Sequence, residues 1–491
     1  MSIDPMAPSW PVALVLLPLA GALLSVLVPR WAVRFGLLTA VATTLAALGL
    51  AGVVLEQGAQ RVSIGGWGAP LGIQLLADGL SAVLVVMTAL VGLAVSGYAV
   101  GYFREHPGQR QHFWPLWLLL WTALNAMLLS ADLFNLYVAL ELVGLSAASL
   151  TALGGNTAAV RGAIRYLMVS LLGSAAYLLG VALLYHHTGT LDIALLSERI
   201  DGAPVVRAAL ATMLVGLLLK TALFPFHFWL PPAHGSAPTP VSAILSALVV
   251  KATFYMALRL WLDLFNGYGL VLGELLGVLG AAAVIWGSVL ALAQTRLKLM
   301  IAYSTVAQLG YLFMAFPLAA AGGAVVWTGA LYLALAHGLA KAAMFMTAGS
   351  LQQFGEHDRI AELDRAVQRL PLTLTAFTLA GVSIMGLPPS GGFIGKWLLL
   401  EAALRQERFV LAGVMVLGGV LAAAYVFKVV GYAFTPAETV HGTHGVPAIM
   451  QWSPLLLAAG AILLGLTMPL VEPLLQVGTA FDVFDAGTES P

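Results

Sequence analysis

Lysine is the residue type through which this chain of 491 amino acids could do chemistry, because five of its six lysines fall inside or at the edge of long apolar stretches. These five are Lys220, Lys251, Lys341, Lys396 and Lys428, and only Lys298 is predicted in a loop. A lysine at mid-bilayer costs on the order of 3 kcal/mol unless it is neutralised, paired or hydrated. Burial also lets a lysine release and take up a proton near neutral pH. The pattern therefore favours proton transfer.

Glu141 is the acidic residue placed to work with these lysines, since it lies deep inside the apolar stretch 133–153. The sequence predicts a buried carboxylate there. If Glu141 faces Lys220, the proton state of each group changes the proton affinity of the other, which would make the pair a gate. A static ion pair that only fixes helix packing is the alternative.

Three further positions extend this pattern. Lys251 lies in the middle of its stretch, too deep to reach the interface, and is expected to be the central relay. His337 and Lys341 are four residues apart, so they share one helical face and favour a relay over a histidine that only satisfies a hydrogen bond. Lys396 is expected to end the far half-channel, with Glu401 as its counter-charge or as an interfacial carboxylate.

Weaker candidates lie beside these positions. His227 and His234 flank an interrupted stretch, where they would either admit protons or cap the unwound backbone. Ser304 and Gln308 could hold water, although small polar residues are also common at helix contacts.

Composition sets the class of protein. Sixty per cent of the residues are hydrophobic and 9% are charged, which predicts an all-α polytopic membrane protein. The absence of cysteine excludes a disulfide framework, cysteine-ligated zinc, an iron–sulfur cluster and a thiol nucleophile, so electron-transfer chemistry would have to come from a partner. No cofactor and no metal site is expected on this subunit. A formal net charge of zero without a basic tract argues against nucleic acid as a partner. The first apolar stretch is expected to be a retained span, because no basic residue precedes it.

A window of about 20 residues, the length that crosses a bilayer, predicts about fourteen transmembrane helices. They cover residues 10–29, 31–55, 80–103, 113–130, 133–153, 160–185, 205–231, 240–264, 269–293, 297–318, 324–349, 372–404, 409–434 and 454–475. Residues 61–74 predict a short β-hairpin or amphipathic cover, and the charged stretch 355–369 predicts an amphipathic surface helix.

Loop charges predict the orientation. When alternate loops are counted, one side of the membrane carries about eleven lysines and arginines, including Lys298. The other side carries about six, including Arg259. The richer side should be cytoplasmic, which places both termini outside the cell.

Two predicted helices are interrupted by proline or glycine, the seventh at 222–227 and the twelfth at 386–392. Because these breaks lie five helices apart, they predict an inverted repeat with a discontinuous helix in each half. The expected domains are 1–112 with three spans and the hairpin, 113–264 as the first repeat, 265–435 as the second repeat, and 436–491 with the last span and tail. Two unrelated proline kinks are the alternative.

Several motifs together resemble one family. They are Asp132-Leu133-Phe134-Asn135-Leu136-Tyr137 before Glu141, Lys220-Thr221-Ala222, Ala237-Pro238-Thr239-Pro240, Ala302-Tyr303-Ser304, Ala336-His337-Gly338-Leu339-Ala340-Lys341 and Gly386-Leu387-Pro388. The chain resembles the antiporter-like, proton-translocating subunits shared by Mrp cation/proton antiporters, complex I and membrane-bound hydrogenases.

The resemblance implies proton movement along a polar axis at mid-membrane. Glu141 and Lys220 match the family's gating pair, Lys251 its central lysine, and Lys341 and Lys396 its second-half carriers. Lysine at 251 and 396 is most similar to the D subunit of Mrp-type Na⁺/H⁺ antiporters or to the smallest complex I relative.

The predicted function is a proton-translocating membrane subunit of a multi-subunit complex, foremost the D subunit of an Mrp-type Na⁺/H⁺ antiporter in the bacterial cell membrane. Its expected partners are other membrane subunits, protons and Na⁺. The alternative is a proton-pumping subunit of an NADH:quinone oxidoreductase, a hydrogenase-type complex or a carbon-uptake relative, which would make the chain a translocase component without its own redox centre. An independent solute carrier would need a specific polar substrate cavity, and a structural scaffold would have no use for deep lysines.

Overall fold

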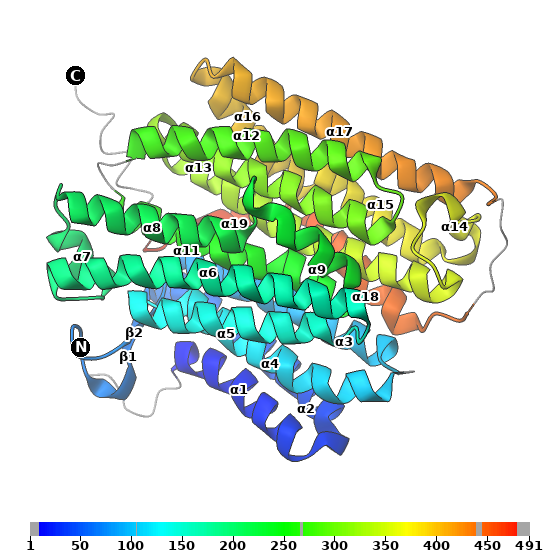
Figure 1. Ribbon diagram of the computed structural model, residues 1–491, viewed down its shortest axis with the longest axis horizontal. Helices are drawn as coiled ribbons and strands as arrows, with labels where there is room; N and C mark the ends of the chain where they lie inside the picture. The colour runs from blue at the N-terminus through cyan, green and yellow to red at the C-terminus, as the bar shows by residue number, and fades with distance from the viewer. Residues whose placement is uncertain (1–8, 105, 266–268, 438–443, 479–491) are drawn as a thin grey trace.

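The computed structural model describes residues 9–104, 106–265, 269–437 and 444–478, and nearly all its elements are helices. Figure 1 shows these helices lying side by side along one direction, with α7 and the β1–β2 hairpin at one end and α14 at the other. The first half contains α1 (Trp10–Leu27), α2 (Ala32–Gln57), β1 (Gln60–Ser63), β2 (Gln74–Ala77), α3 (Gly79–Tyr102), α4 (Pro107–Leu129), α5 (Leu133–Ala152), α6 (Thr157–Thr188), α7 (Ile193–Arg199), α8 (Pro204–Thr221), η3 (Phe226–Trp229), α9 (Leu230–Ser236), α10 (Thr239–Ile244), the π-helical η4 (Leu245–Val249) and α11 (Val250–Leu264). The second half contains α12 (Gly269–Ala293), α13 (Leu297–Gly355), η5 (Ile360–Glu362), α14 (Ala366–Arg369), α15 (Pro371–Met385), α16 (Gly391–Arg405), α17 (Phe409–Phe434), α18 (Ala448–Leu463) and α19 (Met468–Leu475).

The described residues contain eleven helices long and apolar enough to cross a membrane, or up to twelve if α18 and α19 form one bent span. This number counts α13 once, although 59 residues in a straight helix would be about 90 Å long, about three bilayer cores. The backbone of α13 breaks at Gly323, and Lys341 Nζ reaches the carbonyl of Ile301 at 3.1 Å, so its two arms lie antiparallel. The polytopic all-helical class is confirmed, and the number fourteen stays a prediction.

Both predicted interruptions lie inside the bundle. Helix α8 ends at Thr221 because Ala222 adopts a left-handed conformation with φ 59°, and η3 and α9 follow. Helix α15 ends at Met385 because Gly386 is left-handed with φ 83°, and α16 starts at Gly391. The freed carbonyls find donors: Trp229 Nε1 donates to Leu219 at 2.9 Å and Lys396 Nζ to Ile384 at 2.7 Å. Such partners are what make broken helices tolerable in a membrane.

Two predicted helical segments are not single helices in the structure. The predicted span 454–475 consists of α18 and α19, which are bent by 80° relative to each other, and Pro469 lies in the first turn of α19, where proline is favoured. The stretch 355–369 is not one surface helix, since Glu356, Asp364 and Arg365 have positive φ and leave only η5 and α14. The hairpin prediction is confirmed, with β1 and β2 paired antiparallel.

Burial identifies the centre of the molecule. Every residue in the apolar window of α10, η4 and α11 is buried inside the protein, whereas only 33% of the window is buried in α1 and in α17. The segment that carries Lys251 is therefore central, and α1 and α17 are peripheral.

Candidate functional site: a row of buried lysines

Four of the predicted lysines lie in the interior of the protein. Lys220 is on the last turn of α8, Lys251 on the first turn of α11, Lys341 in the second arm of α13 and Lys396 in α16. Their exposed fractions are 4%, 1%, 0% and 9%. The long apolar stretches thus located these side chains correctly. No carboxylate among the described residues forms an ion pair with any of the four.

The first pair differs from its prediction. Glu141 is half-buried on α5 rather than buried, and it forms no direct ion pair with Lys220 in the described part of the chain. The ammonium of Lys220 instead donates to the carbonyl of Leu140 at 3.0 Å, one residue before Glu141, and the two charges remain within electrostatic range. A gap of this kind leaves Lys220 free to change partner without breaking a salt bridge.

Lys251 follows an irregular turn. The π-helical η4 ends at Val249, and Lys251 Nζ donates to the carbonyl of Ser246, which this turn brings within reach. π-helical turns are rare and concentrate at functional sites. Hydroxyl groups continue from here: Ser246 Oγ pairs with Thr305 Oγ1 at 2.8 Å, which links η4 to the first arm of α13.

A second hydroxyl pair connects the first two lysine helices. Thr221 Oγ1, next to Lys220, donates to Thr253 Oγ1 at 3.0 Å, two residues after Lys251. A hydroxyl both donates and accepts, so such pairs suit the passage of a proton.

Lys341 and His337 lie in the second arm of α13, where Lys341 contacts the first arm. Lys341 Nζ donates to Ser304 Oγ and to the carbonyl of Ile301, the latter at 3.1 Å. His337 is 1% exposed, and neither of its ring nitrogens has a hydrogen-bond partner in the described structure. Both amide atoms of the buried Gln308 are likewise unpaired there. Buried polar atoms without protein partners are places where water can bind.

Lys396 closes the row at the second helix break. Its Nζ donates to the carbonyl of Ile384 at 2.7 Å and lies 4.4 Å from the ring centre of Tyr311. Glu401 is not its counter-charge, because that carboxylate pairs with Arg405 at 2.6 Å near the surface. Glu401 therefore fits the alternative prediction, that of an interfacial carboxylate.

The two histidines of the first break differ from each other. His227 is half-buried in η3 with its ring stacked on Phe224 at 5.6 Å. His234 in α9 is fully buried, stacks on Phe345 at 5.0 Å, and has no hydrogen-bond partner for either nitrogen within the described residues. Its nearest charged groups include Lys298 and Lys251, which places His234 beside the row.

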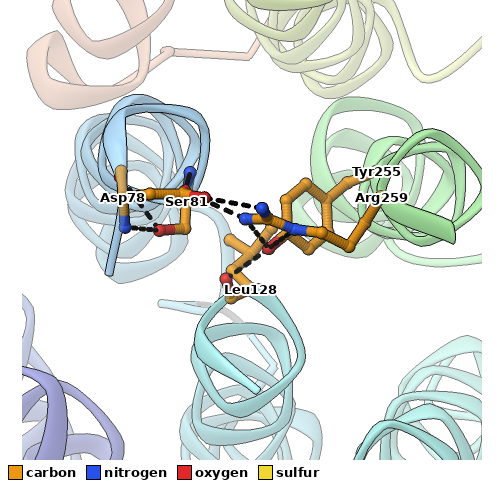
Figure 2. Close-up of polar contacts among 5 residues, drawn as sticks. All are labelled: Asp78, Ser81, Leu128, Tyr255 and Arg259. Carbon is orange, nitrogen blue, oxygen red and sulfur yellow. Dashed lines mark hydrogen bonds and ion pairs between the residues drawn. The ribbon is translucent and has the colours of Figure 1, made fainter. Parts of the chain in front are cut away.

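Two cations assigned to loops are buried in helices. Lys298 lies in the first turn of α13, is 4% exposed and donates to the carbonyl of Ala237 at 2.5 Å. Arg259 lies in α11 and forms a buried ion pair with Asp78, which precedes α3 (Figure 2). Lys298 and Arg259 therefore no longer count as loop charges, which removes one residue from each side of the membrane. Asp78 and Tyr255 were absent from the sequence prediction, although the spacing of Lys251, Tyr255 and Arg259 by four residues was visible there.

The chemistry that this arrangement allows is proton exchange between amines, hydroxyls, an imidazole and one carboxylate. Among the described residues, no group of three or more histidine, cysteine, aspartate or glutamate side chains is arranged to hold a metal ion.

Comparison with known proteins identifies the family. A family described as "NADH:quinone oxidoreductase/Mrp antiporter, TM" matches residues 130–422, which is more than half of the chain. The chain belongs to this family. A second family, described as "NADH-Ubiquinone oxidoreductase (complex I), chain 5 N-terminus", matches residues 63–113. The resemblance derived from the motifs is confirmed, and the protein is a multi-pass membrane protein.

Relatives from both branches of the family align along nearly the whole chain. The N subunit of the NADH-quinone oxidoreductase of Desulforudis audaxviator is 35% identical over 481 residues, 93% of this chain and 95% of that protein. The D subunit of the Na(+)/H(+) antiporter of Bacillus subtilis is 29% identical over 480 residues, 94% of each.

Solved structures show the same fold. A chain of the Mrp complex from Dietzia sp. DQ12-45-1b is 25% identical and superposes with a TM-score of 0.86, covering 98% of both chains. A chain of respiratory complex I from Thermus thermophilus is 28% identical, with a TM-score of 0.74 over 94% of this chain and 98% of that one.

Proposed function

We propose that this chain is a proton-translocating, antiporter-like subunit of a multi-subunit membrane complex. The observation that carries the proposal is the row of four buried lysines, none paired with a carboxylate among the described residues. A buried ammonium without a counter-charge is costly, which favours release of its proton to a neighbour. The proposed order is Glu141, Lys220, Lys251, His337 with Lys341, and Lys396.

The hydrogen bonds of these lysines support proton exchange. Lys220, Lys341 and Lys396 each donate to a backbone carbonyl. A neutral amine still carries N–H groups, so it keeps such a bond after its proton leaves. Loss of the proton therefore removes charge without leaving the carbonyl unpaired.

Groups between and beside the lysines extend the route. We assign Ser304 and Gln308 to the binding of water between Lys341 and Lys396, because Ser304 accepts from Lys341 and Gln308 has no protein partner in the described residues. We assign His227 and His234 to proton entry at the first helix break, where His234 borders the row. Glu401 is left out, since it pairs with Arg405.

Residues 113–264 and 265–435 are proposed as the two inverted repeats, each with one broken helix. Matching close contacts support this assignment. In the first repeat, Gly216 of α8 packs against Gly173 of α6, and in the second, Gly395 of α16 packs against Gly329 of α13. In each pair a broken helix meets an earlier helix of its repeat through glycine. The regions 1–112 and 436–491 flank the repeats.

The complex is proposed to be an Mrp-type Na⁺/H⁺ antiporter in the bacterial cell membrane, with this chain as its D subunit. The alignment with the D subunit from Bacillus subtilis over 94% of both chains and the superposition on the Mrp complex support it. The second candidate is a proton-pumping subunit of an NADH:quinone oxidoreductase, favoured by the 35% identity with an N subunit. In the second candidate, iron–sulfur redox chemistry would come from partner subunits, because this chain has no cysteine.

Purification of the intact complex through a tag on this chain separates the two candidates. An Mrp-type complex should show Na⁺/H⁺ exchange in proteoliposomes and no flavin or iron–sulfur absorbance. A complex that shows this absorbance and quinone-driven proton uptake would establish the second candidate.

Glu141→Ala tests the proton route itself. The variant should lower proton flux about a hundredfold or more, the usual contribution of a proton-transfer group, while the complex still assembles. Glu56→Ala, at an exposed position of α2, is the matched control and should leave the flux unchanged. Full flux in the Glu141 variant would remove this carboxylate from the route.

A further inference from the structure

A second buried polar cluster lies on the same helix as Lys251 but outside the lysine row. It consists of Asp78, at the start of α3, with Tyr255 and Arg259 on α11, and Figure 2 shows the three side chains facing one another. Arg259 Nη1 and Nη2 donate to the two carboxylate oxygens of Asp78 at 2.6 and 2.9 Å. The side chains of Arg259 and Asp78 are 7% and 0% exposed. These three residues are called the Arg259 cluster below.

The Arg259 cluster joins three helices. Tyr255 accepts a hydrogen bond from Arg259 Nη2 at 3.0 Å and donates to the carbonyl of Leu128 at the end of α4 at 2.8 Å. Asp78 also caps α3 by accepting from the backbone N–H of Ser81 at 2.9 Å. The bidentate ion pair thus closes the space between α3, α4 and α11.

A cavity lies directly outside this closure. It has a volume of about 510 Å³ and its lining includes Arg61 of β1, Ser130, Arg259, Leu262 and Asp263. The hairpin lies at this end of the bundle, so the space is called the hairpin-side cavity. Arg259 belongs both to the cavity wall and to the buried cluster, which makes its side chain the boundary between them.

The helix continues inward from this boundary to the lysine row. Lys251, Tyr255, Arg259 and Asp263 follow one another at intervals of four residues, so they lie along one side of α11. A chain of polar groups therefore leads from the hairpin-side cavity past Arg259 and Tyr255 to Lys251.

Arg259 has a second carboxylate within reach. Asp263 is one helical turn away, half-buried, and interacts electrostatically with Arg259, Asp78 and Arg61. In the described part of the chain, Asp263 forms no ion pair. One guanidinium between two carboxylates, of which it pairs with one, is an element that can have two arrangements.

We infer that Arg259 is a gate between the hairpin-side cavity and Lys251. The gate is closed when Arg259 pairs with Asp78, as in this structure, and opens when the guanidinium turns to Asp263. Water from the cavity then reaches Tyr255 and Lys251. This inference rests on the proposed role of Lys251 and gives the row an opening at the hairpin end. A permanent clamp that only holds α3 to α11 is the competing account.

Two chemically identical substitutions distinguish a gate from a clamp. Asp78→Asn keeps the cap of α3, because asparagine is also a good N-cap, but weakens the closed arrangement. Asp263→Asn removes the partner of the open arrangement and leaves the closed pair intact. A gate responds to the two changes in opposite directions, whereas a clamp responds only to the first.

Accessibility of a single cysteine provides the readout, since the chain has no cysteine of its own. Leu258 is fully buried one turn inward from Leu262. In vesicles with the assembled complex, Leu258→Cys is treated from the hairpin side with a membrane-impermeant methanethiosulfonate. Its modification should be at least about tenfold faster with Asp78→Asn than without it, because a buried ion pair has lost one partner. An imposed ion gradient should also accelerate it, and Asp263→Asn should abolish that acceleration.

Matched controls fix the interpretation. Leu262→Cys, in the cavity wall, should react at the same rate in every background, and Ala257→Cys, on the other side of α11, should stay unmodified. If the single asparagine does not fold, the double variant Asp78→Asn/Arg259→Gln removes both charges and should also expose Leu258→Cys. The effect of Asp78→Asn at rest should persist with Lys251→Ala, so it is independent of proton transfer through the row. Absence of any gradient-driven acceleration would overturn the gate in favour of the clamp. Acceleration that is unchanged in Asp263→Asn would show that Arg259 does not turn to Asp263, which overturns the gate as proposed.

Discussion

Lys396 and Lys428 both donate to backbone carbonyls, yet their surroundings differ. Lys396 is buried and binds the carbonyl of Ile384 beside the second helix break. Lys428 is half-buried and binds the carbonyls of Leu292 and Gln294 at 2.9 and 2.8 Å, at the end of α12. The first lies on the proposed route, whereas the second binds the carbonyls at the end of a helix, which is a packing role.

Replacement of each by methionine should separate these roles. Lys396→Met should reduce proton flux about a hundredfold or more, because a proton carrier is lost. Lys428→Met should keep the flux but lower stability by about 1–3 kcal/mol, because two carbonyls lose their donor. Flux in proteoliposomes and thermal unfolding of the purified complex measure the two effects. Equal flux losses in both variants would contradict the distinction.

The apolar stretches predicted that the lysines of the row are buried, but they did not predict which side chains a buried charge contacts. An apolar run fixes how far Lys251 or Lys341 lies from the interface, whatever surrounds it. Arg259 was misplaced because its burial depends on Asp78, which is 181 positions away in the chain. Glu141 was taken as fully buried because its apolar neighbours do not show which side of α5 faces outward.

Elements determine how closely the lysine-bearing helices approach one another. A Cβ added at Gly216 would lie 2.3 Å from the carbonyl oxygen of Gly173, and one added at Gly395 would lie 2.6 Å from the backbone nitrogen of Leu333. Backbone atoms cannot move aside as a flexible side chain does. Gly216 is one turn before Lys220 and Gly395 directly precedes Lys396, so both contacts set lysine positions.

Gly216→Ala and Gly395→Ala should each destabilise the protein by about 1–3 kcal/mol and lower proton flux, because the helix pairs must separate. Gly413→Ala is the matched control: it lies in α17 with open space around it, and should stabilise the helix by up to about 1 kcal/mol. Thermal unfolding and flux assays on the three variants check this. Normal flux in both destabilised variants would show that lysine spacing tolerates the movement.

The helix breaks were predictable because proline lacks a backbone N–H donor and glycine readily adopts a left-handed conformation, so a cluster of these residues favours an interruption. The bend between α18 and α19 was missed, because a 22-residue apolar window does not show where the helix axis changes direction. The wrong prediction of a surface helix at 355–369 shows that a run of charged residues does not by itself specify a helix. There, Asp358 binds Arg296 at 2.9 Å and ties the segment to the start of α13. Such long-range contacts are not visible as local periodicity.

For the whole molecule, orientation follows from the loop charges. After removal of Arg259 and Lys298, the end opposite the hairpin still carries the excess of lysine and arginine. The positive-inside rule therefore predicts the hairpin outside the cell.

Single cysteines at two exposed arginines check the orientation. Arg61→Cys in β1 should react with an impermeant thiol reagent in intact cells, and Arg110→Cys near the start of α4 should react only in inverted vesicles. The reverse pattern would place the hairpin inside and exchange the two ends of the proton route.

The most direct test of the whole route is the rate of proton flux through the assembled complex with Lys251→Ala, measured with a trapped pH dye in proteoliposomes. Lys251 is 1% exposed and lies between the two proposed broken helices, so every proton that crosses from Glu141 to Lys396 must pass it. We predict a flux at the level of protein-free liposomes from a complex with its full set of subunits. Flux equal to that of the unchanged complex would contradict the lysine row as the path of the proton.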